Sequence, residues 1–371
     1  MPVRNGRVNS TCGVIDDFGS QGANRNARDR NYVELTSSFA LTSNSLDSDP
    51  GDTAFGGSVV SMHPNPIQSF RARGLDLIPF WKMAWRKWIT FQTISRKQID
   101  GPASQETYLD RWSAIQSAAQ KSRDLHFMTA SFWKMESLGA DYCRQPPGGN
   151  TLCDPRLPLE VRPIAHTGLG VAAVEVGEFD PARITRTIDS LASPNFRLFA
   201  YESLGAVLGV YEMPVPKNLL GLKRLRRPEP EGFINYFPAE IQRLISNGYG
   251  RILYFNSLDL VSAVRSIARR RFLQAPAAIQ GMAFAYAMVN SSDLWVVLET
   301  GCGFEDSELR TAFQNGLIYA LEFWEWAWPG WLRSLNPPSV RSTELIAIAQ
   351  QEIDSGLARG ELGAFVVGNH G

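Results

Sequence analysis

The sequence of 371 residues is poor in cysteine, with four in all and no Cys-x-x-Cys pair. Four cysteines are too few for a disulfide scaffold, and free thiols are expected in a chain of this size, although Cys143 and Cys153 flank a loop that a bridge could close. No run reaches the roughly 18 apolar residues of a membrane-spanning helix, and the first residues lack the apolar core of a secretory signal. We therefore expect a soluble, cytoplasmic protein.

The sequence also lacks an excess of either charge, because 37 Lys and Arg residues balance 37 Asp and Glu residues. Binding along a phosphate backbone needs a basic excess on at least one face, so no nucleic-acid partner is expected. A neutral chain has little electrostatic repulsion between copies, which favours self-association or a protein partner. The oligomeric state stays open.

Several motifs that define enzyme classes are missing as well. There is no paired-aspartate motif on a helix for magnesium and diphosphate, no Glu-x-x-His pair for di-iron and no Gly-x-Ser-x-Gly elbow. Gly168-x-Gly170 has neither the spacing of a Rossmann turn nor the Lys-Ser/Thr of a P-loop. We predict no metal and no cofactor, and the remaining residues do not specify one reaction.

Three segments combine Gly, Ala and Ser with aromatic residues and few charges: 199–212, 280–290 and 314–328. Small residues let helix backbones approach closely, and aromatic side chains fill the space beside them. We interpret the three segments as central helices of one α-helical domain.

Internal similarity supports this interpretation. Blocks 180–209 and 259–288 each contain an Asp, an amphipathic helix with Arg, a Pro break and a small-residue aromatic helix, and Gly281 and Gly316 are 35 residues apart in similar settings. This pattern is typical of stacked helical hairpins, in which each unit buries its face on the next. The predicted fold is all-α, an α-solenoid-like or irregular array of stacked helical hairpins.

The expected organisation has four parts. Residues 1–66 are rich in Ser, Asn, Asp and Gly without an apolar period, so we expect a disordered arm. An N-terminal helical region (67–145), a helical repeat domain (164–357) and a flexible tail (358–371) follow.

Within the repeat domain, Asp180 and Pro181 are predicted to begin a helix. Asn247-Gly248 is predicted to end one, and Pro329-Gly330 another. A final helix is expected to be capped by Ser342 or Thr343 and by Gly356, and the Gly-rich stretch 166–180 is assigned to no helix.

A helix expected within 66–99 carries Trp81, Trp85 and Trp88 on one face. It is either a core-facing helix with a solvated charged face or an amphipathic helix at a membrane surface. The basic insert 216–232 is either a solvated loop or a docking site for an acidic partner or lipid headgroups. Peripheral membrane contact through either element stays open. The residues expected on the charged face are Lys82, Arg86 and Lys87.

Over roughly residues 180–330 the chain resembles the DUF1702 family, an uncharacterised bacterial family associated with enediyne polyketide biosynthesis clusters. The matching stretches are PNFRLFAYESLG, NGYGRILYFNSLDLVSAVRSI, IQGMAFAYAMVN and FQNGLIYALEFW. Ser203 stands where Gly is usual, and Tyr254 replaces Trp. The resemblance implies a setting in natural-product biosynthesis without a mechanism.

Three functions follow as hypotheses. The protein binds a hydrophobic polyketide- or terpenoid-type intermediate or a synthase partner, or it is a cyclase or isomerase of an apolar polyene or isoprenoid, or it is a purely protein-binding helical scaffold. Aromatic faces stabilise carbocations, and a carboxylic acid can deliver the first proton. The candidate catalytic residues are Glu202, Tyr201, Glu322 and Glu325. The candidate ligand-binding residues are Phe199, Tyr211, Glu212, Arg251, Phe284, Tyr286, Tyr319 and Trp324.

Glu202 distinguishes these hypotheses. A position beside a cavity would favour a ligand or a substrate, whereas an ion pair with Arg197 or Arg251 in a packed core would be structural. We favour the pair with Arg251, because a buried charge needs such a partner.

Overall fold

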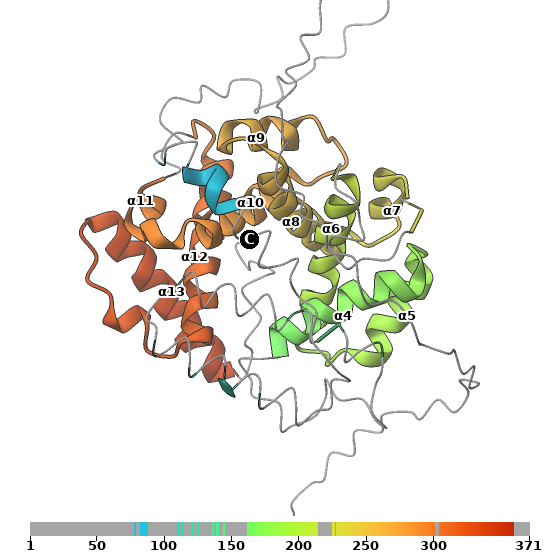
Figure 1. Cartoon of the computed structure of the whole chain (residues 1–371), viewed down its shortest axis with the longest axis horizontal. Helices are drawn as coiled ribbons and strands as arrows, with labels where there is room; N and C mark the ends of the chain where they lie inside the picture. The colour runs from blue at the N-terminus through green and yellow to red at the C-terminus, as the bar shows by residue number, and fades with distance from the viewer. Residues whose placement is uncertain are drawn as a thin grey trace, which may run out of the picture. The chain divides into compact units, whose positions relative to one another are not determined.

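The computed structural model describes residues 162–213, 225–226, 228–300 and 304–359, with side chains to 355, together with 78, 82–87 and single positions between 110 and 144. These residues all belong to the compact unit Pro64–Gly371. The described residues contain helices and no strand, which confirms the all-α prediction (Figure 1). The predicted arm, most of the predicted tail and the four cysteines lie outside them.

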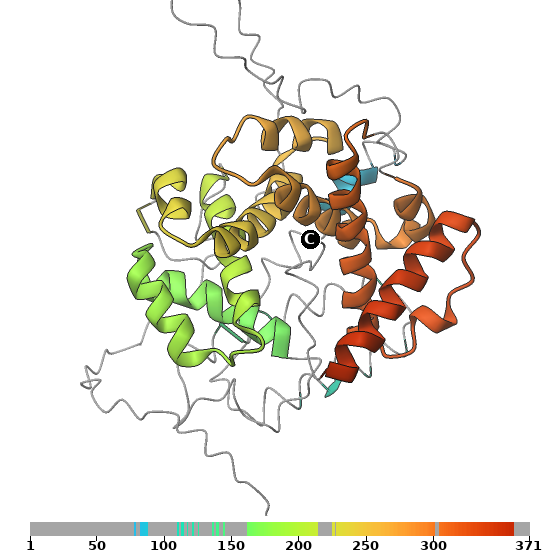
Figure 2. The ribbon, with the colours of Figure 1, turned by 180° about the vertical axis from the view of Figure 1, so that it is seen from behind.

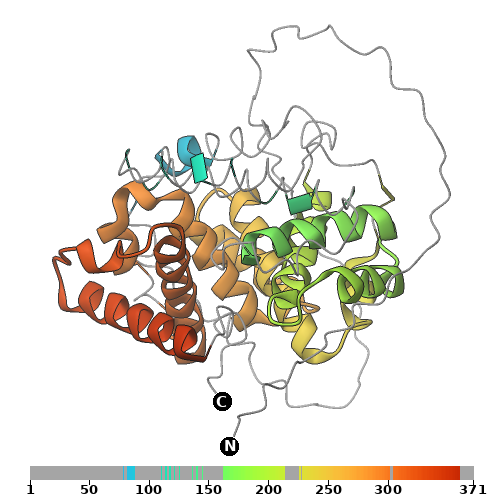
Figure 3. The same ribbon diagram turned by 90° about the horizontal axis from the view of Figure 1, so that it is seen from below.

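Long helices of the described part pack side by side in one row. Neighbours in the row alternate with shorter helices along the chain, and Figures 1 and 3 show α4 toward one side with α8 and α10 in the middle. The row consists of α4 (Arg162–Gly177), α6 (Arg197–Glu212), α8 (Ala239–Asn256), α10 (Ala275–Val289) and α12 (Ser307–Ala327), in that order.

A second helix follows each row helix and packs against it or against the next one. α5 packs on α4, α7 on α8, α9 on α8 and α10, α11 on α10, and α13 on α11 and α12 (Figure 2). The predicted stacking of helical hairpins is therefore confirmed. These helices are α5 (Pro181–Leu191), α7 (Pro230–Asn235), α9 (Leu260–Ala268), α11 (Leu294–Glu299) and α13 (Val340–Arg359).

Glycine allows the row helices to touch backbone to backbone. A Cβ added at Gly205 would overlap the carbonyl oxygen of Ile245, and one at Gly248 would overlap that of Glu202. The two glycines thus open both sides of the contact between α6 and α8, as expected for close helix packing. The same relation links Gly281 to Asn247 and Gly316 to Gln280.

A side-chain cap begins α5 where the sequence predicts it. Asp180 accepts hydrogen bonds from the backbone N–H groups of Ala182 (2.9 Å) and Arg183 (3.1 Å), with Pro181 directly after it. α12 ends at Ala327, which confirms the stop predicted at Pro329-Gly330.

Predictions for three helices are wrong. Asn247-Gly248 does not end a helix, because α8 continues to Asn256 and uses its glycines for contacts with α6 and α10. The Gly-rich stretch 166–180 lies mostly within α4 for the same reason. α13 starts at Val340, before the predicted cap, and runs past Gly356; the hydroxyl of Ser339 accepts the backbone N–H of Ser342 there.

The helical segment 82–87 reverses the predicted orientation. Trp85 is 61% exposed, whereas Lys87 is buried and donates to the carbonyls of Tyr254 and Ser257. Lys82 and Arg86 form ion pairs with Asp293. The charged face turns inward because carbonyls at the end of α8 and the carboxylate of Asp293 can accept its hydrogen bonds there. Trp81 and Trp88 lie outside the described residues. No described helix is both long and apolar enough to cross a membrane.

Candidate functional site

An ion pair between Glu202 of α6 and Arg251 of α8 lies within the helix row, as predicted. Glu202 is 2% exposed and Arg251 is 9% exposed. A buried carboxylate and guanidinium compensate each other, while either alone would be costly.

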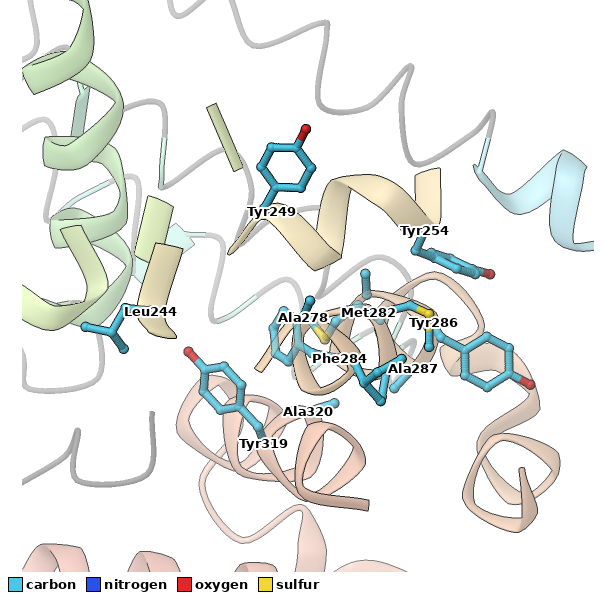
Figure 4. Close-up of a cluster of buried hydrophobic side chains, with 14 of the residues drawn as sticks. Leu244, Tyr249, Tyr254, Ala278, Met282, Phe284, Tyr286, Ala287, Tyr319 and Ala320 are labelled. Atoms are coloured by element: carbon cyan, nitrogen blue, oxygen red, sulfur yellow. The ribbon is translucent and has the colours of Figure 1, made fainter. Parts of the chain in front are cut away.

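Two aromatic residues complete the cluster. The guanidinium carbon of Arg251 lies 4.2 Å from the ring centroid of Phe284 in α10 and 5.4 Å from that of Tyr319 in α12. The Tyr319 hydroxyl donates a long hydrogen bond of 3.4 Å to Glu202. Figure 4 shows Phe284 and Tyr319 near each other, with Tyr254 and Tyr286 on the right of the same cluster.

Contacts between α6 and α12, which are not neighbours in the row, show that the row curves toward this side. One is the bond from Tyr319 to Glu202, and the other is between the rings of Phe199 and Trp326, whose centroids are 6.3 Å apart. Side chains from helices that α8 and α10 separate in the row therefore converge here.

The glycine contacts set the register of this cluster. Gly248 admits the backbone of Glu202, and Arg251 follows three residues later on the same helix face. The same offset separates Gly281 from Phe284 and Gly316 from Tyr319. One row of close contacts thus positions the cation and both rings.

Burial raises the pKa of the Glu202 carboxyl, and the Arg251 guanidinium and the Tyr319 hydroxyl act in the opposite direction. Burial acts to lower the pKa of Arg251, but Glu202, Tyr319 and Glu136 together outweigh it and the net pKa is raised. Burial, with Glu202 beside it, also raises the pKa of Tyr319. Tyr319 therefore remains a neutral hydrogen-bond donor, and Arg251 remains a cation.

A small pocket lies against this cluster and is partly open to solvent. Its volume of about 30 Å³ is enough for about two water-sized groups. All five row helices border the pocket, and most of its lining is aromatic or aliphatic. The described lining residues are Glu136, Pro163, Ile164, Thr167, Phe199, Arg251, Phe284, Tyr319 and Phe323.

Arg251 has spare hydrogen-bonding capacity beside this pocket. Its Nη2 donates to Glu202, but its Nε is buried and has no hydrogen-bond partner in the described part of the protein. A buried donor without a partner is uncommon in folded proteins. This Nε has almost no accessible surface, so it is enclosed by the cluster and does not face the open part of the pocket.

Two predicted carboxylate residues and one tyrosine lie elsewhere. Tyr201 donates to Asp189 at 3.4 Å, and Glu212 pairs with Arg270 at 3.0 Å. Glu325 accepts the backbone N–H groups of Gly330 (2.6 Å) and Leu332 (2.7 Å), so it fixes the turn after α12.

Glu322 is 1% exposed and its Oε2 atom has no hydrogen-bond partner among the described residues. Burial, and next the charge of Glu352, raise its pKa well above the ordinary value. Glu322 is therefore a candidate neutral acid, but it is not among the described residues that line the pocket.

The remaining predicted aromatic residues pack in the core. The Tyr211 ring lies edge-on to Phe179 at 4.9 Å between centroids. The Tyr286 hydroxyl shares a 2.9 Å hydrogen bond with Thr300. Trp324 packs edge-on against Trp331 at 5.5 Å. Of the predicted ligand-binding residues, the pocket brings together Phe199, Arg251, Phe284 and Tyr319.

Sequence reasoning missed the α4 side of the pocket, formed by Pro163, Ile164 and Thr167, because the Gly-rich stretch was not assigned a helix. It also missed Phe323, which is one turn after Tyr319. The repeated offset of three residues after a central glycine is the signal that identifies Arg251, Phe284 and Tyr319.

No group of three or more His, Cys, Asp or Glu side chains within the described ranges could hold a metal ion. Comparison of the chain with protein-family models, curated proteins and solved structures gives no match. The resemblance to an enediyne-associated family therefore stays a prediction.

Proposed function

We propose that the protein is a non-catalytic binding protein of natural-product biosynthesis, which holds a hydrophobic polyketide- or terpenoid-type intermediate by one end. The observation that carries this proposal is a partly open, largely aromatic pocket bordered by the buried guanidinium of Arg251. Ligand sites commonly combine an apolar lining with a few fixed polar groups.

The size of the pocket limits what enters it. A volume of about 30 Å³ admits an end group and not a whole polyene, so the rest of the ligand would lie outside it. Apolar side chains of Pro163, Ile164 and Phe323 line the pocket and would contact the adjoining part of such a chain.

Binding has more support than cyclisation. A cyclase needs an acid that reaches the substrate. Glu202 faces the cluster but is held by Arg251, and Glu325 is held by two backbone N–H groups. Glu322 is not among the described lining residues.

The test is native mass spectrometry of protein purified from its own host, with extraction of anything bound. We expect a hydrophobic molecule to co-purify with the wild type. A Thr167→Phe variant, which fills the pocket from α4, should release it. Thr187→Phe is the matched control, because Thr187 is also half-buried and bonds to the carbonyl four residues before it, as Thr167 does.

Two results would contradict the proposal. One is wild-type protein that is free of ligand in repeated preparations from its host. The other is equal retention of the ligand by both threonine variants, which would place it away from this pocket.

Binding of a synthase partner is the second candidate, and the C-terminal end of α9 favours it. Arg265, Arg269 and Arg271 are exposed, and no hydrogen bond or ion pair within the described part occupies their side chains. Such a group suits an acidic surface. Replacing all three with Gln should abolish salt-sensitive capture of a synthase encoded nearby; unchanged capture would reject this surface.

A further inference from the structure

We propose that the ligand enters the pocket by its hydrocarbon end, and that its polar head, a carboxylate, carbonyl or hydroxyl group, stays outside in water. This inference rests on the proposed function, because it names the end of the ligand that the same pocket takes. The polar groups of the pocket, its apolar lining and its size all support it.

The polar groups that border the pocket already bond to other parts of the protein. The Thr167 hydroxyl donates to the carbonyl of Pro163 at 3.1 Å, one turn earlier on α4. The Tyr319 hydroxyl donates to Glu202, and so does Nη2 of Arg251, whose Nε has almost no accessible surface. A polar end group would therefore lose its water and find these donors already used, which costs free energy.

The charged groups at the pocket are engaged as well. The guanidinium of Arg251 pairs with Glu202, and its central carbon lies 4.2 Å from the ring centroid of Phe284. Glu136 also has an interaction partner of its own. A polar or charged end group would compete with contacts that the protein already makes, whereas a hydrocarbon end leaves them intact.

The rest of the lining is hydrocarbon from four helices of the row. The rings of Phe284 and Phe323 lie edge to face with their centroids 5.7 Å apart, so two adjoining parts of the lining are aromatic. An apolar chain end that moves from water to such surfaces gains about fourfold in affinity for each buried methylene group. The apolar lining residues besides Tyr319 are Pro163, Ile164, Phe199, Phe284 and Phe323.

The size of the pocket leaves the polar head outside. Its volume of about 30 Å³ holds the tip of a chain, and its open side leaves the remainder of the ligand in contact with solvent. A head group in water stays accessible to a second protein. This orientation suits an intermediate that is handed on to an enzyme.

The experiment measures, by isothermal titration calorimetry, the affinity of the purified full chain for octanoate, α-hydroxyoctanoate and ω-hydroxyoctanoate. The two hydroxy acids are isomers that differ only in which end of the chain carries the hydroxyl group. We expect α-hydroxyoctanoate to bind about as tightly as octanoate, because its hydroxyl group stays in water. We expect ω-hydroxyoctanoate to bind at least about tenfold more weakly, because its hydroxyl group must lose water inside the pocket.

Two pairs of variants locate the effect. Thr167→Phe should abolish octanoate binding, while Thr187→Phe should leave it unchanged. Phe323→Ala should weaken octanoate binding about fivefold, because the chain end loses contact with a ring, while Phe255→Ala should not. Phe255 is also a half-buried ring edge-on to an aromatic neighbour, but it is not among the described lining residues. The phenylalanine pair decides if Thr167→Phe fails to fold.

The outcomes separate the inference from the proposed function. Weaker binding of α-hydroxyoctanoate alone would show that the polar head enters the pocket, and equal effects of the two hydroxyl positions would show that neither end is preferred. Either result would overturn the inference, while octanoate binding that Thr167→Phe abolishes would keep the hydrophobic site. Absence of binding by every probe, or octanoate binding that neither Thr167→Phe nor Phe323→Ala changes, would overturn both.

Discussion

The ammonium group of Lys87 lies 3.8 Å from the ring centroid of Tyr254 and donates a 2.8 Å hydrogen bond to the carbonyl of the same residue. A second bond of 2.8 Å reaches the carbonyl of Ser257. These carbonyls close α8, so the cation also faces the negative end of the helix dipole. Lys87 therefore fixes segment 82–87 to the centre of the helix row.

Replacing Lys87 with Met should lower the free energy of unfolding by about 2 kcal/mol, because a buried ammonium loses two charge-assisted hydrogen bonds. Urea unfolding measures the change. Lys82→Met is the control: Lys82 is 35% exposed and shares Asp293 with Arg86, so its loss should cost about 0.5 kcal/mol or less. Equal effects of the two variants would contradict the role assigned to Lys87.

Gly248→Ala should destabilise the protein, although Ala normally stabilises a helix interior by roughly 0.5–1 kcal/mol. The new Cβ would overlap the carbonyl of Glu202 and lie 3.0 Å from the backbone N of Ala206. α6 and α8 must then separate, so we expect the free energy of unfolding to fall by about 2 kcal/mol or more. Thermal unfolding measures this change.

Gly232→Ala is the matched control for this prediction. Gly232 is exposed in α7, and its Cβ would meet only the flexible carboxylate of Glu229 at 3.1 Å. The stability of the Gly232→Ala variant should equal that of the wild type or be slightly higher. A stabilising Gly248→Ala would show that the helices of the row are not in backbone contact there.

The start of α5 was predictable because the signal and its effect lie within a few residues, at Asp180 and Pro181. The start of α13 was not, because its cap lies at Ser339, before the predicted residues. Helix ends were harder. The Asn247-Gly248 pair is a local stop signal, but the gain from packing α8 against α6 and α10 outweighs it. The sequence alone shows a central glycine without showing which backbone lies against it.

The residues of the candidate site were also predictable only in part. Phe284 and Tyr319 could be selected because they stand in segments of small and aromatic residues, and Arg251 because a buried Glu202 needs a charged partner. Glu136 could not, since only tertiary packing brings it to the pocket. The exposed position of Trp85 also escaped prediction, because the partners of its basic neighbours lie about two hundred positions away.

His166 should make stability fall in mild acid. Its Nδ1 lies 2.6 Å from the Arg162 carbonyl, and its Nε2 accepts the Ser193 N–H at 2.9 Å, so the buried ring is neutral. Burial lowers its pKa to about 4. The unfolded chain binds a proton first, so stability is complete above the ordinary pKa of 6.5 and is lost as pH falls toward 4.

With pKa values of 6.5 in the unfolded chain and about 4 in the folded protein, His166 should lower the free energy of unfolding by about 2 kcal/mol at pH 5. Urea unfolding of the wild type and of His166→Gln at pH 7 and pH 5 checks it. The advantage of the wild type at pH 7 should shrink by that amount at pH 5. An advantage that does not change with pH would show that His166 is not held neutral.

Glu322 and Glu325 lie one turn apart on α12, and replacing each with Gln should change stability in opposite directions. Burial raises the pKa of Glu322, so the folded state holds this proton more strongly than the unfolded chain does. The free energy of unfolding therefore falls as pH rises above the ordinary pKa of 4.5. Gln removes this cost, and Glu322→Gln should stabilise the protein at pH 7 but not at pH 4. Glu325→Gln loses charge-assisted bonds to Gly330 and Leu332, at a cost of about 1–2 kcal/mol at pH 7. Thermal unfolding of both variants at pH 7 and pH 4 measures these changes in stability. If Glu322→Gln destabilised the protein at pH 7, the Glu322 carboxylate would be charged and would have a partner. The two variants would then change stability in the same direction, which would contradict the prediction.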